Sequence, residues 1–419
     1  MKLLLALLLV VAIYIGSVPL LLVLSAFIIL RALLHLWIHH ATSSLQVMRS
    51  MDQRLFFGER TAVRIELHSQ SALPVPWILL REHVPLSLAT SGVVSHALML
   101  PARGTAAFTY ELTGKQRGYH AVGPIQISAG EVLGLSRREL EVPARSSILV
   151  YPRLLSAHEL ELPTLVLFGD LRSRRHLIGD PARMHGVREY LPGDPLHDIH
   201  WRATASSGAL QVKHYQPSTA AQTMIFLDLQ RAAYPRPLKH AAVEYAISVA
   251  ATLASRLIEQ RQAVGLATTG LLYLPSGADH ATHSPEPDWS SKPEVRAHGD
   301  RLWHSMAEPM APARGRGQLL QVLETLACLE VNPELCTMAS LLTRYALSLP
   351  WGATIVIITA QLPDELFVAL HRLREAGLSA LVLCVRSDPD RAALEARARS
   401  LGARLHFQPY DQSREAVPS

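Results

Sequence analysis

The sequence predicts a membrane-anchored protein with an N-terminal transmembrane helix or hairpin, an all-β sandwich-like domain and a doubly wound α/β domain. Three observations predict this order. No charged side chain occurs between Leu3 and Leu30. The apolar residues then follow a period of two as far as about residue 152. Beyond residue 222, buried strands alternate with amphipathic helices. A chain of 419 residues exceeds what one core usually holds, so two or three domains are expected.

The composition excludes several classes of protein. Hydrophobic residues make up 49% of the chain and charged residues 18%, and the N-terminal segment accounts for this apolar balance. The 40 basic and 35 acidic residues are spread along the chain without dense Lys/Arg blocks, so nucleic acid is not expected as a partner. The three cysteines lack CxxC spacing and are odd in number, which fits neither a zinc knuckle nor a disulfide framework. They are typical of a reducing compartment.

Residues 1–44 are predicted to insert into the lipid bilayer. At about 1.5 Å of rise per residue, the uncharged stretch is long enough to cross a hydrocarbon core of about 30 Å. Gly16, Ser17 and Pro19 interrupt it, either as a kink in one span or as the tip of a helical hairpin, and the hairpin is slightly favoured. A cleaved signal peptide is the alternative, but the stretch is long for one and no A-x-A site follows. The excess of arginine after the segment places the bulk of the chain in the cytoplasm, on the inner membrane.

Residues 45–153 are predicted to form a β-rich, sandwich-like domain. Val63, Ile65 and Leu67 alternate with polar neighbours, as a half-buried strand requires, and residues 108–112 repeat the pattern. Short runs of this kind are separated by Pro, Gly and Ser clusters, which is typical of an antiparallel sandwich. No catalytic group stands out, so the expected role is that of a spacer or docking module near the bilayer.

Residues 154–221 are a connector that contains the most distinctive run of the chain, residues 187–215, which we call the clasp. A Pro-Gly turn is followed by an aspartate that can accept backbone N–H bonds, and large apolar side chains alternate with arginines. Two interpretations stay open. Trp201 and Tyr190 pin the segment onto the α/β domain, or the same residues bind a protein partner, because interfaces concentrate Trp, Tyr and Arg. The candidate residues are Arg188, Tyr190, Gly193, Asp194, Ile199, Trp201, Arg202 and Gly208.

A metal site in the clasp is a weaker hypothesis. His197 and His200 form an H-x-x-H pair, with acidic residues and a further histidine close in sequence. Pro195 argues against a regular helix through the pair, and such a pair without a third fixed ligand is a weak signal.

The order R-x-Y-x-x-G-D-x-x-x-x-I-x-W-[RK]-A-[ST]-A-x-x-G-x-L in the clasp resembles the signature of domain-of-unknown-function family 58. In this family His197 and Asp198 would be replaced by a basic pair, and Ser206 often by Arg. The resemblance covers almost the whole chain. The matching positions are Arg188, Tyr190, Gly193, Asp194, Ile199, Trp201, Arg202, Ala203, Thr204, Ala205, Gly208 and Leu210.

The resemblance implies a membrane-anchored protein with a von Willebrand factor A-like domain. It also implies partners, because relatives occur beside MoxR-type AAA+ ATPases and transglutaminase-like membrane proteins. The α/β domain is expected over residues 222–408, with a flexible insertion at 277–315 and a tail at 409–419. Its expected strands are Thr223–Asp228, Ala263–Ala267, Ala353–Thr359 and Leu378–Val385, and its expected helices are Lys239–Leu257 and Pro363–Ala376.

Domains of this fold often hold Mg²⁺ at the carboxyl edge of the sheet, on an Asp-x-Ser-x-Ser loop and a later aspartate. Asp228 occupies the first position, but Gln230 and Ala232 replace the hydroxyl residues, and Thr359 and Ala360 end the later strand. One carboxylate supplies too few oxygens to offset the dehydration of the ion. We therefore expect no bound metal and no cofactor, with Asp228 bracing the turn after its strand.

The sequence lacks the motifs of common catalytic sites. It contains no G-x-S-x-G elbow, Walker loop, HExxH or G-x-G-x-x-G in strand–helix context. The expectation is thus a non-catalytic, membrane-tethered adaptor or scaffold that binds another protein. A metal-dependent ligand-binding module on the same fold is the alternative, and a hydrolase with an unrecognised site is a less favoured one.

Overall fold

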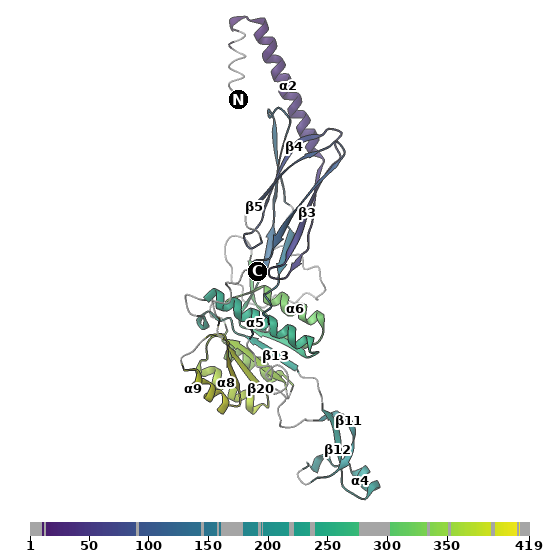
Figure 1. Ribbon diagram of the computed structural model, residues 1–419, viewed down its shortest axis with the longest axis vertical. Coiled ribbons are helices and arrows are strands. Elements are labelled where there is room, and N and C mark those ends of the chain that lie inside the picture. Colours follow the sequence, from purple (N-terminus) through teal and green to yellow (C-terminus); the bar gives the residue numbers. More distant parts are fainter. Residues whose placement is uncertain are drawn as a thin grey trace. The chain divides into compact units, whose positions relative to one another are not determined.

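The computed structural model divides into two compact units, Met1–Tyr151 and Pro152–Ser419 (Figure 1). Most of the first hairpin arm predicted over 3–15, Gly193 of the clasp, and residues 277–301 of the predicted insertion lie outside the described residues. The structure describes residues 11, 14–88, 92–143, 146–156, 159–160, 179–191, 194, 196–217, 222–234, 239–275, 302–332, 336–350, 353–386, 390–408 and 410.

Helix α2 (Val18–Ser43) carries the apolar N-terminal sequence. It begins just after Gly16, whose φ is 67°, and Pro19 lies in its first turn, where a missing N–H costs no helical hydrogen bond. Among the described residues, α2 and His240–Glu259 are long and apolar enough to cross a membrane. Only 17% of the most apolar window of α2 is buried, against 67% for the second helix. Burial therefore identifies the second helix as a core helix, whereas α2 is consistent with a membrane anchor.

The first unit contains three small sheets. Strands β1, β3 and β6 form one antiparallel sheet, and β5, β4, β8 and β9 form another. In the third sheet β10 pairs with β7 antiparallel and with β2 parallel. The strands are β1 (Leu45–Ser50), β2 (Arg54–Leu55), β3 (Arg60–Ser69), β4 (Val75–His83), β5 (Val93–Leu100), β6 (Thr105–Thr113), β7 (Gly118–Val122), β8 (Ile125–Gly130), β9 (Arg137–Val142) and β10 (Ser146–Val150).

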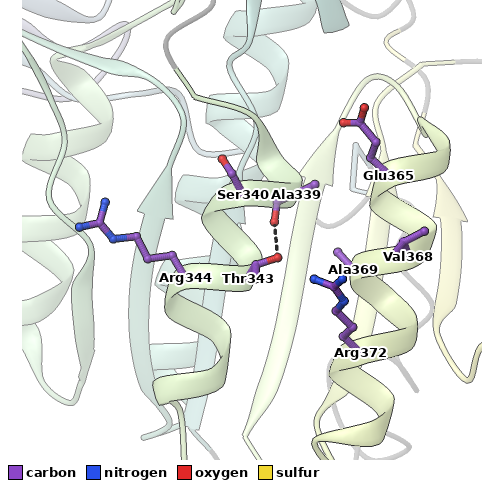
Figure 2. Close-up of a pocket in the computed structure, with 8 residues that line it drawn as sticks. All are labelled: Ala339, Ser340, Thr343, Arg344, Glu365, Val368, Ala369 and Arg372. Carbon is purple, nitrogen blue, oxygen red and sulfur yellow. Dashed lines mark hydrogen bonds between the residues drawn. The ribbon is translucent and has the colours of Figure 1, made fainter.

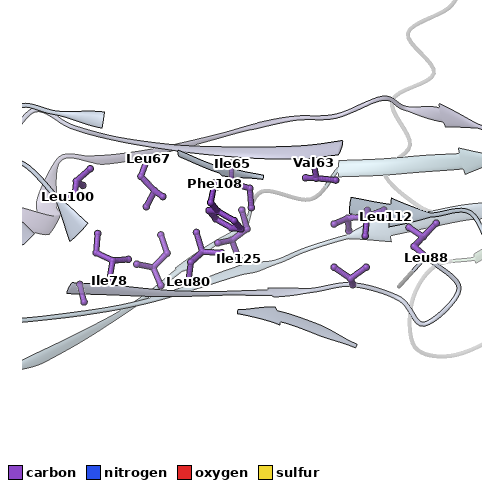
Figure 3. Close-up of a cluster of buried hydrophobic side chains, with 14 of the residues drawn as sticks. Val63, Ile65, Leu67, Ile78, Leu80, Leu88, Leu100, Phe108, Leu112 and Ile125 are labelled. Atoms are coloured by element: carbon purple, nitrogen blue, oxygen red, sulfur yellow. The ribbon is translucent and has the colours of Figure 1, made fainter. Parts of the chain in front are cut away.

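One hydrophobic core joins the sheets of this unit (Figure 3). Val63, Ile65 and Leu67 of β3 are fully buried and alternate with exposed or half-buried neighbours, so the predicted alternation is confirmed. Ile78 and Leu80 of β4 contribute the same period from the facing sheet. Period-two burial on both sheets explains why they pack face to face.

The same core buries a charged network. Arg49 of β1 pairs with Glu82 of β4, and the two side chains are 3% and 0% exposed. The Tyr110 hydroxyl of β6 donates a hydrogen bond to Glu82 Oε2 at 2.5 Å. Burial raises the pKa of Tyr110, and the adjacent Glu82 carboxylate raises it further. The three groups connect both sheets at one point.

The second unit is built around a six-stranded sheet in the order β17-β14-β13-β19-β20-β21. All neighbouring strands in it are parallel except β17, which pairs antiparallel with β14. Central strands such as β19 are buried at every residue, as parallel strands covered on both faces require. The strands are β13 (Gln222–Leu227), β14 (Ala263–Thr268), β17 (Met310–Ala313), β19 (Thr354–Thr359), β20 (Ser379–Cys384) and β21 (Arg404–Phe407).

Helices cover this sheet. Figure 1 shows α5 and α6 together on one side of β13, and α5 contacts β13, β14 and β19. A separate buried cluster joins α7, α8 and α9 to alternate residues of β13, β19 and β20. The expected alternation of strands and helices is therefore found. The helices are α5 (Lys239–Glu259), α6 (Arg316–Ala327), α7 (Met338–Tyr345), α8 (Asp364–Glu375) and α9 (Arg391–Ser400).

The prediction of a flexible insertion over 277–315 is wrong for residues 302–313. Strand β16 (Leu302–Met306) pairs with β15 (Leu271–Pro275), which also pairs with β18 (Leu329–Glu330), and β17 forms an edge of the main sheet. The prolines and low apolar content of this stretch argued against strands. An edge strand tolerates proline, because one side of its backbone has no ladder partner.

Candidate functional site

The clasp folds as a small unit in which two paired strands enclose a short helix. We call these strands and this helix the frame of the clasp. Strands β11 (Gly179–Glu189) and β12 (Gln211–Pro217) pair antiparallel, and between them lie a 3-10 turn (Leu196–Asp198) and helix α4 (Trp201–Ser207). Gly208 ends α4 with a φ of 71°, and its N–H donates to the Thr204 carbonyl. This is the left-handed helix end that glycine adopts without a Cβ penalty. Gly208 thus ends the helix shortly before β12 begins.

A bidentate ion pair closes the loop of the clasp. Arg188 Nη1 and Nη2 donate to Asp194 Oδ2 and Oδ1 at 2.7 and 2.6 Å. Asp194 Oδ2 also accepts the Leu191 N–H at 2.9 Å. The Arg188 hydrogen bonds hold the pKa of Asp194 below its usual value, so the carboxylate stays ionised at neutral pH. Two members of the predicted signature are thus partners of each other.

Backbone and capping bonds fix the start of α4. Ile199 is buried and forms an antiparallel bridge with Val212 of β12. His200 Nδ1 accepts the Ala203 N–H at 3.0 Å, as an N-terminal cap does. Thr204 Oγ1 accepts the Gln211 N–H at 3.0 Å. The position that suggested a metal ligand, His200, therefore has a capping role here. The described residues contain no group of three or more metal-ligating His, Cys, Asp or Glu side chains.

Several large apolar side chains of the clasp are exposed. The Trp201 side chain is 69% exposed and Leu196 is 70% exposed. Leu191 is 61% exposed, and Leu210 is also exposed. Four large apolar side chains of the clasp are therefore exposed to solvent in the described structure. We call Leu191, Leu196, Trp201 and Leu210 the apolar face of the clasp.

The remaining signature residues lie around this face. The Tyr190 N–H donates to the Leu210 carbonyl at 2.9 Å, which closes the β11 end of the loop. The Tyr190 side chain is half-buried, and Arg202 is exposed next to Trp201. Tyr190 and Arg202 are adjacent in sequence to Leu191 and Trp201 of the apolar face.

The Asp228 carboxylate lies at the carboxyl edge of the main sheet and is 5% exposed. Thr269 Oγ1 and the Gln230 N–H both donate to Asp228 Oδ1 at 3.1 Å, and Thr359 Oγ1 donates to Oδ2 at 2.9 Å. Burial raises the pKa of Asp228 above its usual value, although these donors oppose the shift. The carboxylate thus joins the ends of β13, β14 and β19.

Three residues of this network were missed by the sequence reasoning. Thr269 accepts the Leu229 N–H at 2.8 Å while it donates to Asp228. The Tyr234 hydroxyl donates to the Asp228 carbonyl at 2.7 Å, and Asn332 Nδ2 donates to the Thr269 carbonyl at 2.9 Å. The sequence offered one signal for this network, the pair of threonines at 268 and 269 at the end of a buried strand. Thr269 contacts Asp228 only because β14 pairs with β13, which the sequence alone does not show.

These residues do not fit a Mg²⁺ ion. Both oxygens of Asp228 already accept hydrogen bonds from the protein. Gln230 contributes its backbone N–H, a donor, and Ala232 and Ala360 have no side-chain oxygen. An octahedral oxygen site needs more acceptors than this set supplies. The geometry is that of a structural brace between strand ends.

Among the described residues of the second unit are two pockets whose lining residues form no catalytic arrangement. A pocket of about 480 Å³ lies between α7 and α8 (Figure 2). It is lined by Ala339, Ser340, Thr343, Arg344, Glu365, Val368, Ala369 and Arg372. The other, of about 320 Å³, lies at the ends of β19 and β20 and is lined by Ala360, Gln361, Leu362, Pro363, Cys384, Arg386, Asp390 and Leu394.

Solved structures resemble this chain over parts of it. The CARDB domain of a Pyrococcus furiosus protein, in complex with di-metal ions, is 15% identical and matches 25% of this chain and 91% of that chain, with a TM-score of 0.20. A beta-glucosidase from Listeria innocua is 13% identical and matches 25% of this chain and 16% of that chain, with a TM-score of 0.17. TM-scores this low carry no argument about fold or function.

Sequence comparisons are more informative. The family described as "Protein of unknown function DUF58" matches residues 186–284, which include the whole clasp and the first strands of the α/β sheet. The uncharacterized protein YeaD of Bacillus subtilis (strain 168) is 23% identical over 256 residues, or 57% of this chain. The chain spans 61% of the length of that relative. The signature in the clasp and these two matches support a protein of the DUF58 family, with the family match itself confined to residues 186–284.

Proposed function

We propose that this protein is a membrane-tethered, non-catalytic adaptor whose clasp binds a protein partner. The observation that carries the proposal is the exposure of Trp201, 69%, on a frame held by the Arg188–Asp194 pair. A tryptophan without a packing role in the described structure favours the interface interpretation over the pinning one. Arg202 beside it adds a forked donor of the kind that interfaces concentrate.

Burial of this face in an interface would contribute favourable binding free energy. A tryptophan buries about 200 Å² in an interface, which at about 25 cal/mol/Å² contributes about 5 kcal/mol before the costs of association. The apolar face does not have to be ordered on binding, because the Arg188 pair, the His200 cap and the Gly208 helix end already fix it. Preorganisation lowers the entropic cost of complex formation.

We further propose that the α/β unit has a von Willebrand factor A-like fold. When the strands of this sheet are numbered by their order in the chain, their spatial order is 3-2-1-4-5-6. Strand 3, which is β17, lies at the edge and is antiparallel to its neighbour. This is a doubly wound order in which ligands usually bind at the carboxyl edge. In this chain Asp228 braces that edge, so the metal-dependent alternative is less favoured than the adaptor.

The family resemblance supplies the proposed partner, a MoxR-type AAA+ ATPase or its client. The α2 helix would hold the chain on the inner membrane with its bulk in the cytoplasm. Tethering then raises the effective concentration of the partner at the membrane without chemistry from this chain. A transglutaminase-like membrane protein is the other partner that the resemblance suggests.

The test is binding of a purified MoxR-type ATPase from the same organism to the full chain in lipid nanodiscs. Trp201→Ala should weaken binding at least about 30-fold, because a central hot spot contributes at least about 2 kcal/mol. Val368→Ala is the matched control, since Val368 is 55% exposed on α8 in the same unit. Equal affinity of both variants and the parent chain would contradict the clasp as the interface, provided that their circular dichroism is unchanged.

A further inference from the structure

The turn between β8 and β9 presents two apolar side chains on a rigid support. Val132 is 78% exposed and Leu133 is 60% exposed. The buried Glu131 carboxylate accepts the backbone N–H groups of Leu133, Gly134 and Ser136, the last at 2.8 Å. Trp77 Nε1 also donates to the Glu131 carbonyl at 3.0 Å. The turn is therefore held in one shape with its apolar tip outward.

This turn belongs to the part of the β unit that packs against α2. Arg138 of β9 donates to the His39 carbonyl at 2.7 Å and to Thr42 Oγ1 at 2.9 Å. Trp37 Nε1 donates to the Pro74 carbonyl at 3.0 Å. On the same helix face Ile38 and Ala41 are fully buried, and Leu34, one turn earlier, is 8% exposed. The β unit thus covers the last third of α2 as one packed body.

The register shows which way the turn points. Arg138 pairs with Ala129, and the next pair towards the turn joins Arg137 and Gly130. Gly130 lies opposite Trp77 near the start of β4, so the turn and Pro74 are at the same end of the sheet. Along α2, Pro74 contacts Trp37, which precedes the residues that Arg138 contacts. The turn therefore points towards the N-terminal, apolar part of α2.

The rise per residue in strands and helices indicates which part of α2 lies level with the tip of the turn. The chain from Ala129 through the end of β8 to Val132 in the turn extends at most about 10 Å, at about 3.3 Å per extended residue. The same distance along α2 is about seven residues at about 1.5 Å each, which brings the tip from His39–Thr42 to the level of Leu34. Trp37 lies between these levels, and tryptophan is enriched where the hydrocarbon core meets the headgroups.

We propose that the turn Glu131–Ser136 enters the lipid bilayer, with Val132 and Leu133 inserted at the boundary between headgroups and acyl chains. This inference rests on the proposed membrane anchoring by α2. Lipid is the occupant because the exposed tip reaches the level of α2, whose apolar N-terminal part is largely exposed and fits a lipid environment. The β unit then has two membrane contacts, a helix and a turn, which fix its orientation on the bilayer.

The experiment places an environment-sensitive NBD label on single cysteines in the full chain, in a Cys328→Ala, Cys336→Ala, Cys384→Ala background reconstituted into nanodiscs with and without nitroxide-labelled lipid. Leu133→Cys tests the turn. Leu86→Cys is the matched control, because Leu86 is 68% exposed just after β4, at the opposite end of the sheet. Leu22→Cys, 65% exposed on α2, tests the anchor itself.

We expect labels at positions 133 and 22 to emit at shorter wavelength than the label at 86 and to lose most of their fluorescence with nitroxide lipid. Quenching at 22 without quenching at 133 overturns the inserted turn and leaves the anchor intact. No quenching at 22 overturns the membrane anchoring on which both depend. A blue-shifted but unquenched label at 133 means that protein covers the turn, which also overturns the proposal.

Discussion

At the scale of single residues, burial decides what a polar side chain does. Asp228 and Asp194 are both aspartates in hydrogen-bonded loops, yet burial raises the pKa of Asp228 while Arg188 lowers that of Asp194. The first has neutral donors from threonine hydroxyls and the second a guanidinium. Asp228 is thus a group whose ionisation opposes folding, and Asp194 one whose ionisation supports it.

This difference gives a pH prediction for Asp228. Because its pKa is raised in the folded state, its contribution to stability is complete below the unfolded value of 3.8 and is lost as pH rises through the folded pKa. Between these two pKa values, the ionisation of Asp228 lowers the free energy of unfolding by at most about 1.4 kcal/mol for each pH unit of increase. Asp228→Asn should remove this dependence. Denaturant titrations of both chains at several pH values measure it, and parallel pH profiles would contradict it.

At the scale of elements, the clasp depends on how α4 ends. Gly208 has a φ of 71°, and no heavy atom lies within 4 Å of the place that a Cβ would occupy, so a substitution there meets backbone strain and not a steric clash. The helix is short and has few buried residues of its own to compensate for such strain.

We predict that Gly208→Ala destabilises the clasp by about 1 kcal/mol, because alanine is strained at positive φ. Amide hydrogens of α4 should then exchange about fivefold faster, as measured by mass spectrometry. Gly186→Ala is the control, since Gly186 also has nothing within 4 Å but lacks a positive φ. Equal exchange in the two variants would show that the helix end does not limit the stability of α4.

At the scale of the whole molecule, each unit has its own core. One buried cluster lies among the strands of the first unit and α2, and another joins β13, β19 and β20 to α7, α8 and α9. The Arg49–Glu82 pair lies within the first unit. Removing one partner of a buried pair leaves an uncompensated charge, so its effect should be confined to that unit.

Glu82→Gln should destabilise the first unit by about 3–5 kcal/mol, because Arg49 would stay buried without a carboxylate. Hydrogen exchange should accelerate in β3, β4 and β6 of the full chain, while β13 and β19 keep the rates of the parent protein. Arg64→Gln is the control, since its pair with Glu66 is largely exposed and is expected to contribute at most about 1 kcal/mol. Equal acceleration in both units would contradict independent cores.

Much of the element order was predictable because it follows from local periodicity. The apolar stretch of α2, the alternation of Val63, Ile65 and Leu67, and the buried run of β19 each carry their pattern within a few residues. Strand β17 was missed because its prolines are compatible with a strand only at a sheet edge, which is a property of its neighbours. In the clasp the candidate residues were identified from the sequence. The sequence did not show that Arg188 and Asp194 hold the loop together while Trp201 is exposed.

The sequence by itself determined that this chain has an apolar helix, a β-rich unit, an α/β unit and the DUF58 signature, because hydrophobic period and residue order are local. The tertiary structure alone decided that Arg188 pairs with Asp194, that Trp201 is exposed, and that Thr269 and Thr359 meet Asp228. These are contacts between residues up to 131 positions apart. Whether a side chain is buried or exposed depends on which strands become neighbours, and that is settled only when the whole sheet packs.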